Sequence, residues 1–298
     1  MVLILASACG LGWVVSQTRE QWLAGRAIVA RGGIVEYDYM YDSARNRRLP
    51  NGTPWRPVWL QKVLGDDYFH NVVGVSLDDV ATDADLVHIA RLRHVKLLYL
   101  GGGRVTDDGL KHLQNLTDLR LLILWGNPIS GDGLKYLRDL KKLRHLDLSR
   151  TQVTDSQLTG LRNLSGLERI DLPNNPQLTG SFLQYVADLP NLKDFVLRGT
   201  GITDSALSYL EHAKNVQSLM LDRTRVTDAG LPHLRGLSSL RSLDLSQTAV
   251  TDAGIPHLRG LSGLRSLDLT ETAVTDKGIT SVREWLPQVG LIPLMAKK

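Results

Sequence analysis

A short motif, V-T-D-x-G-L or a close variant, recurs along this chain and constrains its fold more than any other feature. Successive copies begin 24 residues apart, apart from one 25-residue step between Val153 and Leu178. The copies begin at Ala81, Val105, Ile129, Val153, Leu178, Ile202, Val226, Val250 and Val274. Repeats of this length are typical of solenoids, in which each unit packs only against its neighbours.

Each period combines a helical pattern with a strand pattern. In one of the clearest units, Thr227 or Asp228 is placed to cap a short helix by accepting hydrogen bonds from the first-turn N–H groups. Leu231, Leu234 and Leu237 then recur every three residues, which predicts one apolar stripe on a tight helical turn. The L-x-x-L-x-L segment that follows ends in the alternation of a strand.

A single unit cannot bury both of these apolar faces, but stacked units can. We therefore expect an α/β fold, a right-handed horseshoe solenoid with a parallel sheet on its concave side and helices on its convex side. The pattern resembles the leucine-rich-repeat family, whose L-x-x-L-x-L motif is carried here by Leu119, Leu122 and Leu124 and their equivalents. The resemblance covers roughly residues 72–294.

The turns after the strands depart from the family pattern. The family often places an asparagine three residues after the last leucine, where its amide bonds neighbouring backbones, and Asn127 and Asn175 keep it. Threonine takes this place at Thr151, Thr200, Thr224, Thr248 and Thr272. A threonine hydroxyl can still satisfy one backbone group per turn.

The T-D-x-G-L helix start resembles two groups of repeat proteins. One group is the repeats that follow F-boxes in ubiquitin-ligase adaptors, although no F-box-like three-helix segment precedes Ala81 here. The other is bacterial repeat proteins, particularly those of planctomycetes. These resemblances imply a fold much more strongly than a function.

We divide the chain into three parts: a hydrophobic anchor or truncated signal segment (residues 1–15), an N-terminal cap (16–71), and the solenoid with its C-terminal cap (72–298). The cap is expected to contain a helix over 17–31, ended by a glycine pair, then an aromatic strand over 34–41 and a short helix over 57–64. This order resembles the N-terminal segment of planctomycete membrane-anchored repeat proteins. A small recognition module is the alternative for this region.

The C-terminal end of the solenoid also needs a cap, because the last unit would otherwise expose its apolar face. The final period begins at Val274 and then loses the leucine spacing. We expect Trp285, Ile292 and Leu294 to close the core there.

The first fifteen residues carry no charge and predict association with a membrane. As a helix they would rise roughly 22 Å, less than the hydrocarbon core of about 30 Å. No basic residue precedes them, and a start assigned too far downstream would explain both deficits. A lipoprotein-like cleavage site at Cys9 and a buried helix are the alternatives. Arg19, Arg26 and Arg31 favour a cytoplasmic body, but missing upstream charges would reverse this, so the membrane side stays open.

The concave face is the expected partner-binding surface, because the strand residues that alternate with the buried leucines point into it. Its apolar part comprises Leu97, Tyr99, Leu121, Ile123 and Trp125. Its polar part comprises His145, Asp147, Arg169, Asp171, Asp194, Arg198, Asp222, Asp244 and Asp268. An apolar patch with a charged rim is typical of protein-binding sites. The alternative is that the N-terminal cap folds over the apolar part and buries it.

Four of these aspartates, Asp147, Asp171, Asp244 and Asp268, occupy equivalent positions in their units and are expected to form a column. Adjacent strands lie about 4.8 Å apart, so neighbouring carboxylates could bind a cation or a basic partner. A solvated acidic stripe, partly neutralised by the nearby arginines, is the alternative.

No catalytic, cofactor or metal motif accompanies these residues. The chain lacks G-x-S-x-G, H-E-x-x-H and P-loop motifs, and its one cysteine excludes Cys-rich metal sites. The equivalent histidines His88, His112, His233 and His257 lack a matched ligand shell. The glycines 101–103 are explained by a tight repeat turn. The net charge of +4 comes from dispersed basic residues, so no nucleic-acid partner is expected.

We therefore predict a non-catalytic, membrane-tethered scaffold whose concave face binds a protein or glycan partner. A soluble intracellular adaptor like the F-box-type repeat proteins is one alternative. An enzyme or cation-binding protein that uses the aspartate column is the other.

Overall fold

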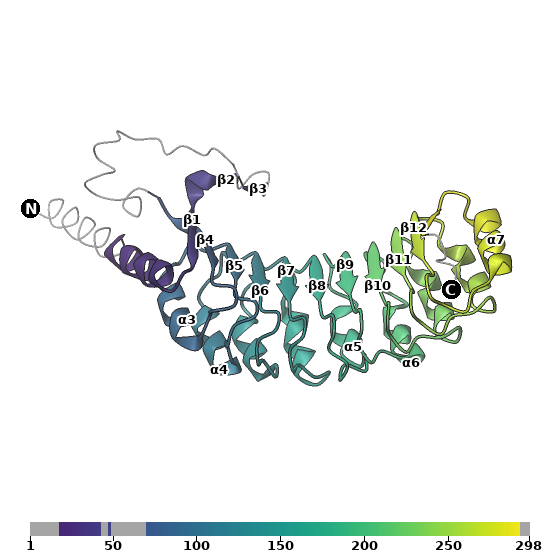
Figure 1. The fold of residues 1–298 in the computed structure, drawn as a ribbon, viewed down its shortest axis with the longest axis horizontal. Coiled ribbons are helices and arrows are strands. Elements are labelled where there is room, and N and C mark those ends of the chain that lie inside the picture. Colours follow the sequence, from purple (N-terminus) through teal and green to yellow (C-terminus); the bar gives the residue numbers. More distant parts are fainter. Residues whose placement is uncertain (1–17, 43–46, 49–69, 293–298) are drawn as a thin grey trace, which may run out of the picture.

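The computed structural model describes residues 18–42, 47–48 and 70–292 and shows an open solenoid, with strands along one side and helices along the other (Figure 1). Eleven strands form one sheet in the order β1-β4-β5-β6-β7-β8-β9-β10-β11-β12-β13. All neighbours pair in parallel except β1, which is antiparallel to β4. The predicted α/β repeat solenoid is confirmed.

The strands of the solenoid are short and evenly spaced along the chain. They are β4 (Val72–Ser76), β5 (Leu97–Tyr99), β6 (Leu121–Ile123), β7 (His145–Asp147), β8 (Arg169–Asp171), β9 (Asp194–Val196), β10 (Ser218–Met220), β11 (Ser242–Asp244), β12 (Ser266–Asp268) and β13 (Gly290–Leu291). β1 (Ile34–Tyr37) extends this sheet, and β2 (Tyr41–Asp42) pairs with β3 (Arg47–Arg48) in a separate antiparallel ribbon.

The convex side mixes α-helical and 3₁₀ turns. The α-helices are α3 (Asp83–Ile89), α4 (Asp107–Leu110), α5 (Leu183–Val186), α6 (Asp204–Leu207) and α7 (Asp276–Trp285). The 3₁₀ helices are η1 (Asp38–Met40), η3 (Lys111–Leu113), η4 (Asp132–Leu137), η5 (Gln157–Asn163), η6 (Ser208–Leu210), η7 (Leu231–Gly236) and η8 (Ile255–Gly260). The three-residue leucine spacing suits a 3₁₀ helix, because its side chains at i and i+3 eclipse.

The core lies between these two layers and runs the length of the solenoid. The middle residue of each three-residue strand is fully buried, as Leu98, Leu122 and Leu146 illustrate. The predicted stripe Leu231, Leu234 and Leu237 is buried as well. The leucine periodicity therefore identified the core correctly.

The aspartate of the repeated T-D pair joins each unit to the next one. Thr227 Oγ1 accepts from Ala229 N at 3.2 Å in the turn before η7, but the N-cap of η7 is Gly230, so the capping predicted for Thr227 or Asp228 was wrong in this unit. The carboxylate of Asp228 instead accepts from both N and Oγ1 of Thr251 in the following unit. Equivalent bonds of 2.6–3.0 Å join Asp83–Thr106, Asp107–Ser130, Asp155–Thr179, Asp204–Thr227 and Asp252–Thr275. We call these bonds the Asp–Thr links.

The glycine of T-D-x-G-L makes room for these links. A Cβ on Gly109 would lie 2.1 Å from Asp83 Oδ1, and one on Gly254 would lie 2.3 Å from Asp228 Oδ1. Such distances are far below van der Waals contact. At these positions the glycine leaves room for the carboxylate of the preceding unit, whereas its own φ is not in the left-handed region. Phe182 takes the glycine position after Asp155, so this link forms without a glycine.

Two units lack the aspartate, and in each case the unit that follows also lacks the glycine. Gly131 and Gly180 take its place, and the glycine expected in the following unit is replaced by Gln157 and Ala206, respectively. A Cβ on Gly131 would lie 2.7 Å from the Cβ of Gln157, and one on Gly180 would lie 2.5 Å from that of Ala206. The side chain of the later unit therefore fills the space that a link occupies elsewhere.

The turns after the strands differ in how far their side chains reach. Nδ2 of Asn127 donates to Leu100 O and Leu124 O, and its Oδ1 accepts from Val105 N, so it joins two units. Asn175 does the same. Each threonine hydroxyl donates to the carbonyl three residues earlier, as Thr224 does to Leu221, so each satisfies one backbone group as predicted. Thr272 Oγ1 also accepts from Val274 N at 3.4 Å.

The N-terminal region partly matches its prediction. Residues 18–30 are helical, and a Schellman motif ends the helix: Gly32 has φ +84°, Gly33 N donates to Ile28 O, and Gly32 N donates to Val29 O. The strand predicted over 34–41 was too long, because η1 interrupts it after Tyr37. The helix predicted over 57–64 lies outside the described residues.

Helix 18–30 lies against the first unit of the solenoid. Ala24 and Ile28 are fully buried. Arg91 Nη1 lies 3.2 Å from Glu20 Oε2, and beyond the helix end Arg31 Nε lies 3.3 Å from Asp85 Oδ1. Both apolar and polar contacts thus join this helix to α3 and the residues around it.

The C-terminal end is closed differently from the prediction. Ile279, Val282 and Leu286 are buried in or next to α7, and Trp285 packs against the core from a half-buried position. Ile292 is 45% exposed and so does not close the core, because the helical spacing of α7 already supplies the apolar face. Leu294 lies outside the described residues.

No described helix has both the length and the hydrophobicity to cross a bilayer. The anchor predicted at residues 1–15 lies outside the described residues.

The concave face as a candidate interaction surface

Strand register sorts the concave residues into columns that run across the sheet. The inner column comprises Leu97, Leu121, His145, Arg169, Asp194, Ser218, Ser242 and Ser266. The central column comprises Tyr99, Ile123, Asp147, Asp171, Val196, Met220, Asp244 and Asp268. Trp125, Arg198 and Asp222 stand two residues after the central column, in what we call the outer column. The predicted surface residues thus share one face of the sheet.

The apolar part lies on β5 and β6. Leu97, Leu121, Ile123 and Trp125 are all half-buried, so they contribute to the surface. Trp125 lies against the neighbouring turn: a Cβ on Gly101 would be 2.0 Å from its Nε1. The indole ring therefore packs directly against the glycine backbone.

The glycines at 101–103 each have a separate structural reason. Gly101 leaves room for the indole of Trp125. Gly102 has φ +70°, and Gly103 approaches the carbonyl oxygen of Ala81, which would lie 2.6 Å from an added Cβ. The prediction of a tight repeat turn is confirmed, and the turn also seats the aromatic side chain.

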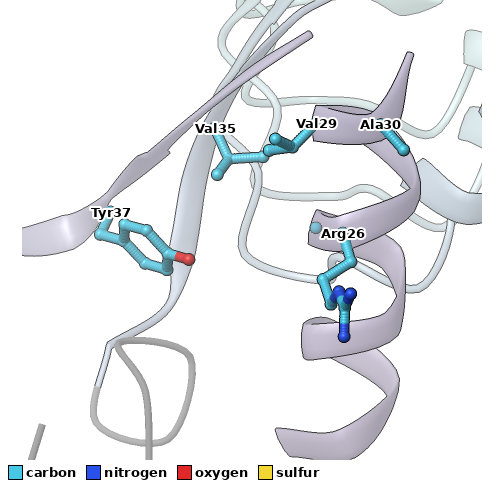
Figure 2. A pocket seen from close by; sticks show the side chains of 6 residues that line it. Arg26, Val29, Ala30, Val35 and Tyr37 are labelled. Atoms are coloured by element: carbon cyan, nitrogen blue, oxygen red, sulfur yellow. The ribbon is translucent and has the colours of Figure 1, made fainter. Parts of the chain in front are cut away.

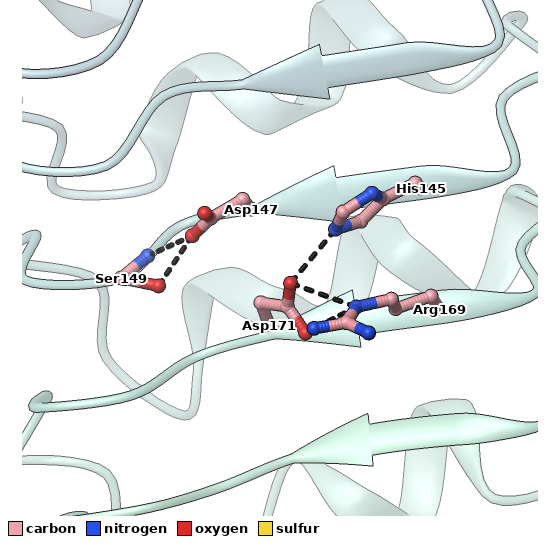
Figure 3. Close-up of polar contacts among 5 residues, drawn as sticks. All are labelled: His145, Asp147, Ser149, Arg169 and Asp171. Carbon is pink, nitrogen blue, oxygen red and sulfur yellow. Dashed lines mark hydrogen bonds and ion pairs between the residues drawn. The ribbon is translucent and has the colours of Figure 1, made fainter.

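A neutralised acidic cluster occupies the middle of the face (Figure 3). Asp171 is 8% exposed, and both of its carboxylate oxygens lie 2.9 Å from Arg169 Nε. Its Oδ2 also lies 2.7 Å from His145 Nε2. Asp147 bonds Ser149 through its Oδ1. In the part of the chain that the structure describes, protein donors therefore reach both oxygens of Asp171 but only Oδ1 of Asp147.

The aspartate column is interrupted. Asp147 faces Asp171 and Asp244 faces Asp268, as predicted, but Val196 and Met220 separate the two pairs. Among residues 18–42, 47–48 and 70–292, no group of three or more His, Cys, Asp or Glu side chains is arranged to hold a metal ion. The cation-binding alternative therefore gains no support as a metal site.

A second acidic cluster lies on β10 to β12. Asp222 Oδ2 is 2.7 Å from Arg198 Nε, and Asp244 Oδ2 is 3.9 Å from Arg198 Nη2. Burial raises the pKa of Asp244, and the charges of Asp222 and Asp268 raise it further, although hydrogen bonds from Ser246 act in the opposite direction. The three carboxylates thus share one electrostatic environment.

A separate hollow of about 360 Å³ lies between helix 18–30 and β1 (Figure 2). Val29, Ala30 and Val35 line its apolar part. Arg26 also lines it and lies 4.8 Å from the ring centre of Trp22. No residue type in this hollow indicates a particular ligand.

Comparisons with known proteins identify the family. The Leucine Rich repeat model matches residues 139–156, 236–255 and 263–282. No curated protein sequence matches the chain significantly. The crystal structure of internalin C2 from Listeria monocytogenes is similar with a TM-score of 0.55 and 27% identity, over 67% of this chain and 81% of the internalin.

Two further solved structures align less well. An internalin (inlF) from Listeria monocytogenes aligns with a TM-score of 0.44 and 19% identity, over 80% of this chain and 87% of that chain. The ectodomain of the Arabidopsis thaliana receptor kinase GASSHO1/SCHENGEN3, solved in complex with CASPARIAN STRIP INTEGRITY FACTOR 2, aligns with a TM-score of 0.45 and 19% identity, over 70% of this chain and 31% of that chain. The three matched repeats and the internalin C2 fold show that this chain is a leucine-rich-repeat protein.

Proposed function

We propose that this protein is a non-catalytic scaffold that binds a protein partner on its concave face. The observation that carries the proposal is the surface of β5 to β12, where an apolar patch with a tryptophan packed against glycine backbone adjoins charged groups on one face of a rigid sheet. Solenoids present extended concave surfaces of this kind to their partners. Tryptophan in such a setting is typical of binding hot spots.

A site-specific photo-crosslinker tests this proposal in the native cell. The crosslinking amino acid replaces Leu121 and, in a second variant, Ser242, which both lie in the half-buried inner column. Tyr209 on the convex η6, which is 41% exposed, is the control position. We expect adducts to one defined protein from the two concave positions only.

A charge introduced into the apolar part provides a second test. Ile123→Asp places a charge within the apolar part and should abolish the crosslink from Ser242 to the same protein. Equal adducts from Tyr209, or none from either concave position in folded protein, would refute the proposal.

We further propose that residues 1–15 tether this scaffold to a membrane. Their uncharged, apolar composition supports the proposal. Cell fractionation with protease treatment of intact cells, following a C-terminal tag, tests both the tether and its side. Recovery of the full-length protein in the soluble fraction would exclude the tether.

A further inference from the structure

The acidic cluster on β10 to β12 carries more negative charge than the protein neutralises. It contains the carboxylates of Asp222, Asp244 and Asp268 and the single guanidinium of Arg198. The hydrogen bond to Asp222 raises the pKa of Arg198, and the charges of all three aspartates contribute. The cluster therefore keeps a local excess of two negative charges at neutral pH when its carboxyls are ionised.

The carboxylate oxygens also lack donors. Asp222 is 3% exposed, yet its buried Oδ1 has no hydrogen-bond partner. Ser246 and Thr270 bond Oδ1 of Asp244 and of Asp268, but no donor within the described residues reaches Oδ2 of Asp268. An unpartnered buried carboxylate oxygen is costly, because the group has lost its water without gaining a donor.

The cluster around Asp171 provides an internal comparison. There, one buried carboxylate receives two partners, Arg169 and His145. On β10 to β12, Arg198 is the one cation near three carboxylates within the described residues, and its own side chain is 49% exposed. Among the described residues, the same face thus contains one buried carboxylate with partners at both oxygens, Asp171, and one with an unpartnered oxygen, Asp222.

The side chains of the inner column beside this cluster are short. The inner column beside this cluster consists of Ser218, Ser242 and Ser266, which are short and uncharged. A planar guanidinium presents five donors and can reach carboxylates on two strands that lie about 4.8 Å apart. The guanidinium of Arg198 already pairs in this way with the carboxylates of Asp222 and Asp244.

We infer that the cluster of Asp222, Asp244 and Asp268 is a subsite for an arginine side chain of the protein partner. The inference rests on the proposed function, because it assigns the chemistry of one part of the concave surface. It places the charge-recognising half of that surface at β10 to β12 and the apolar half at β5 and β6.

Fluorescence anisotropy with a labelled oligo-arginine peptide tests the inference on the purified full chain. An oligo-citrulline peptide of equal length is the neutral control, because citrulline keeps the shape of arginine without its charge. The variants are Asp222→Asn and the less buried Asp268→Asn. Asp139→Asn, whose side chain is 69% exposed and lies away from the sheet, makes the same change in net charge.

We expect oligo-arginine to bind at near-physiological salt and oligo-citrulline not to bind. Each cluster variant should weaken binding on the order of tenfold, since charge pairs in partly buried sites depend on both partners. Asp139→Asn should leave the affinity within about twofold, as expected for exposed charges. Circular dichroism establishes that the variants are folded.

Three results would overturn the inference: equal binding of both peptides, equal weakening by all three variants, or unchanged affinity in Asp268→Asn. Because this assay uses no natural partner, its failure leaves the crosslinking test of the concave face unaffected. A crosslinked partner together with failed peptide binding would reject the arginine subsite alone.

Discussion

The substitution Gly109→Ala should destabilise the solenoid although alanine is the better helix former. Gly109 lies in α4, and an added Cβ would be 2.1 Å from Asp83 Oδ1. To restore ordinary contact the carboxylate must withdraw by about 1 Å, since non-bonded atoms repel steeply at shorter range. That movement breaks its bonds of 2.8 and 2.7 Å to N and Oγ1 of Thr106.

The magnitude follows from three terms. Hydrogen bonds to a charged group contribute about 1.5–3 kcal/mol each when buried, and half-buried Asp83 belongs at the lower end. Overpacking costs about 1–3 kcal/mol, whereas alanine regains up to about 1 kcal/mol of helix propensity over glycine. Two lost bonds at about 1.5 kcal/mol each, together with overpacking and less the propensity gain, give an expected loss of about 3–5 kcal/mol. The melting temperature falls by roughly 2–4 °C per kcal/mol in a chain of this size.

Thermal and guanidinium unfolding, followed by circular dichroism, measures this loss. Gly260→Ala is the matched control, because an added Cβ there meets nothing within 4 Å. In an Asp83→Ala background, Gly109→Ala should cost at least about 1 kcal/mol less, because in that background only Leu86 Cδ1 remains close. The reasoning fails if Gly109→Ala is as harmless as Gly260→Ala, or if its cost is the same in both backgrounds.

Further predictions concern pH, backbone strain and the aromatic group. Burial alone would raise the pKa of Asp107, but hydrogen bonds from the following unit outweigh burial and lower the pKa. The ionised carboxylate therefore stabilises the fold above the ordinary pKa of 3.8, and this stabilisation is lost as pH falls through the folded-state pKa. Asp107→Asn should therefore destabilise the protein at neutral pH by about 1–3 kcal/mol, and urea midpoints should converge with wild type in acid; a difference independent of pH would contradict this. Asp244 has a raised pKa, so its ionised form costs stability above the folded-state pKa; Asp244→Asn should raise the urea midpoint at neutral pH and lose this advantage in acid. Arg150 has φ +53°, so Arg150→Gly should raise stability by about 0.5–1 kcal/mol; an unchanged or lower midpoint would argue against strain there. Gly101→Ala should displace the indole of Trp125 and change its fluorescence, whereas an unchanged spectrum would mean that the ring is not seated on Gly101.

The sequence pattern predicted the parts of the fold that depend on one unit at a time. The buried leucines, the tight helical turn and the strand register follow from periodicity, because hydrophobic burial is set by which face each side chain takes. The columns of the concave face follow in turn, since a constant repeat length aligns equivalent residues. Asp147 therefore faces Asp171 and Asp244 faces Asp268.

Interactions that depend on the offset between units were harder to predict. The Asp–Thr links were missed, because an aspartate at a helix start is equally suited to capping its own helix. A partial signal was nevertheless present in the sequence. Where glycine replaces the aspartate, at Gly131 and Gly180, Gln157 and Ala206 replace the later glycine, although Phe182 also replaces it after Asp155. The unequal neutralisation of the two acidic clusters depends on side-chain directions that periodicity does not specify.

The exchange at Gly180 has a consequence for how the solenoid opens. The level of Gly180 has neither an Asp–Thr link nor a bridging asparagine, whereas Asn175 bridges the level of Gly131 and an Asp–Thr link joins every other level from Ala81 to Val274. In a linear array, stability is a sum over units and their interfaces, so the weakest interfaces divide the array into cooperative blocks. Hydrogen exchange should therefore reveal two protected blocks that meet at the level of Gly180, with the apolar patch in the first block and the acidic cluster on β10 to β12 in the second. A partner that binds both ends of the concave face at once would link these blocks and raise the cooperativity of unfolding of the whole chain.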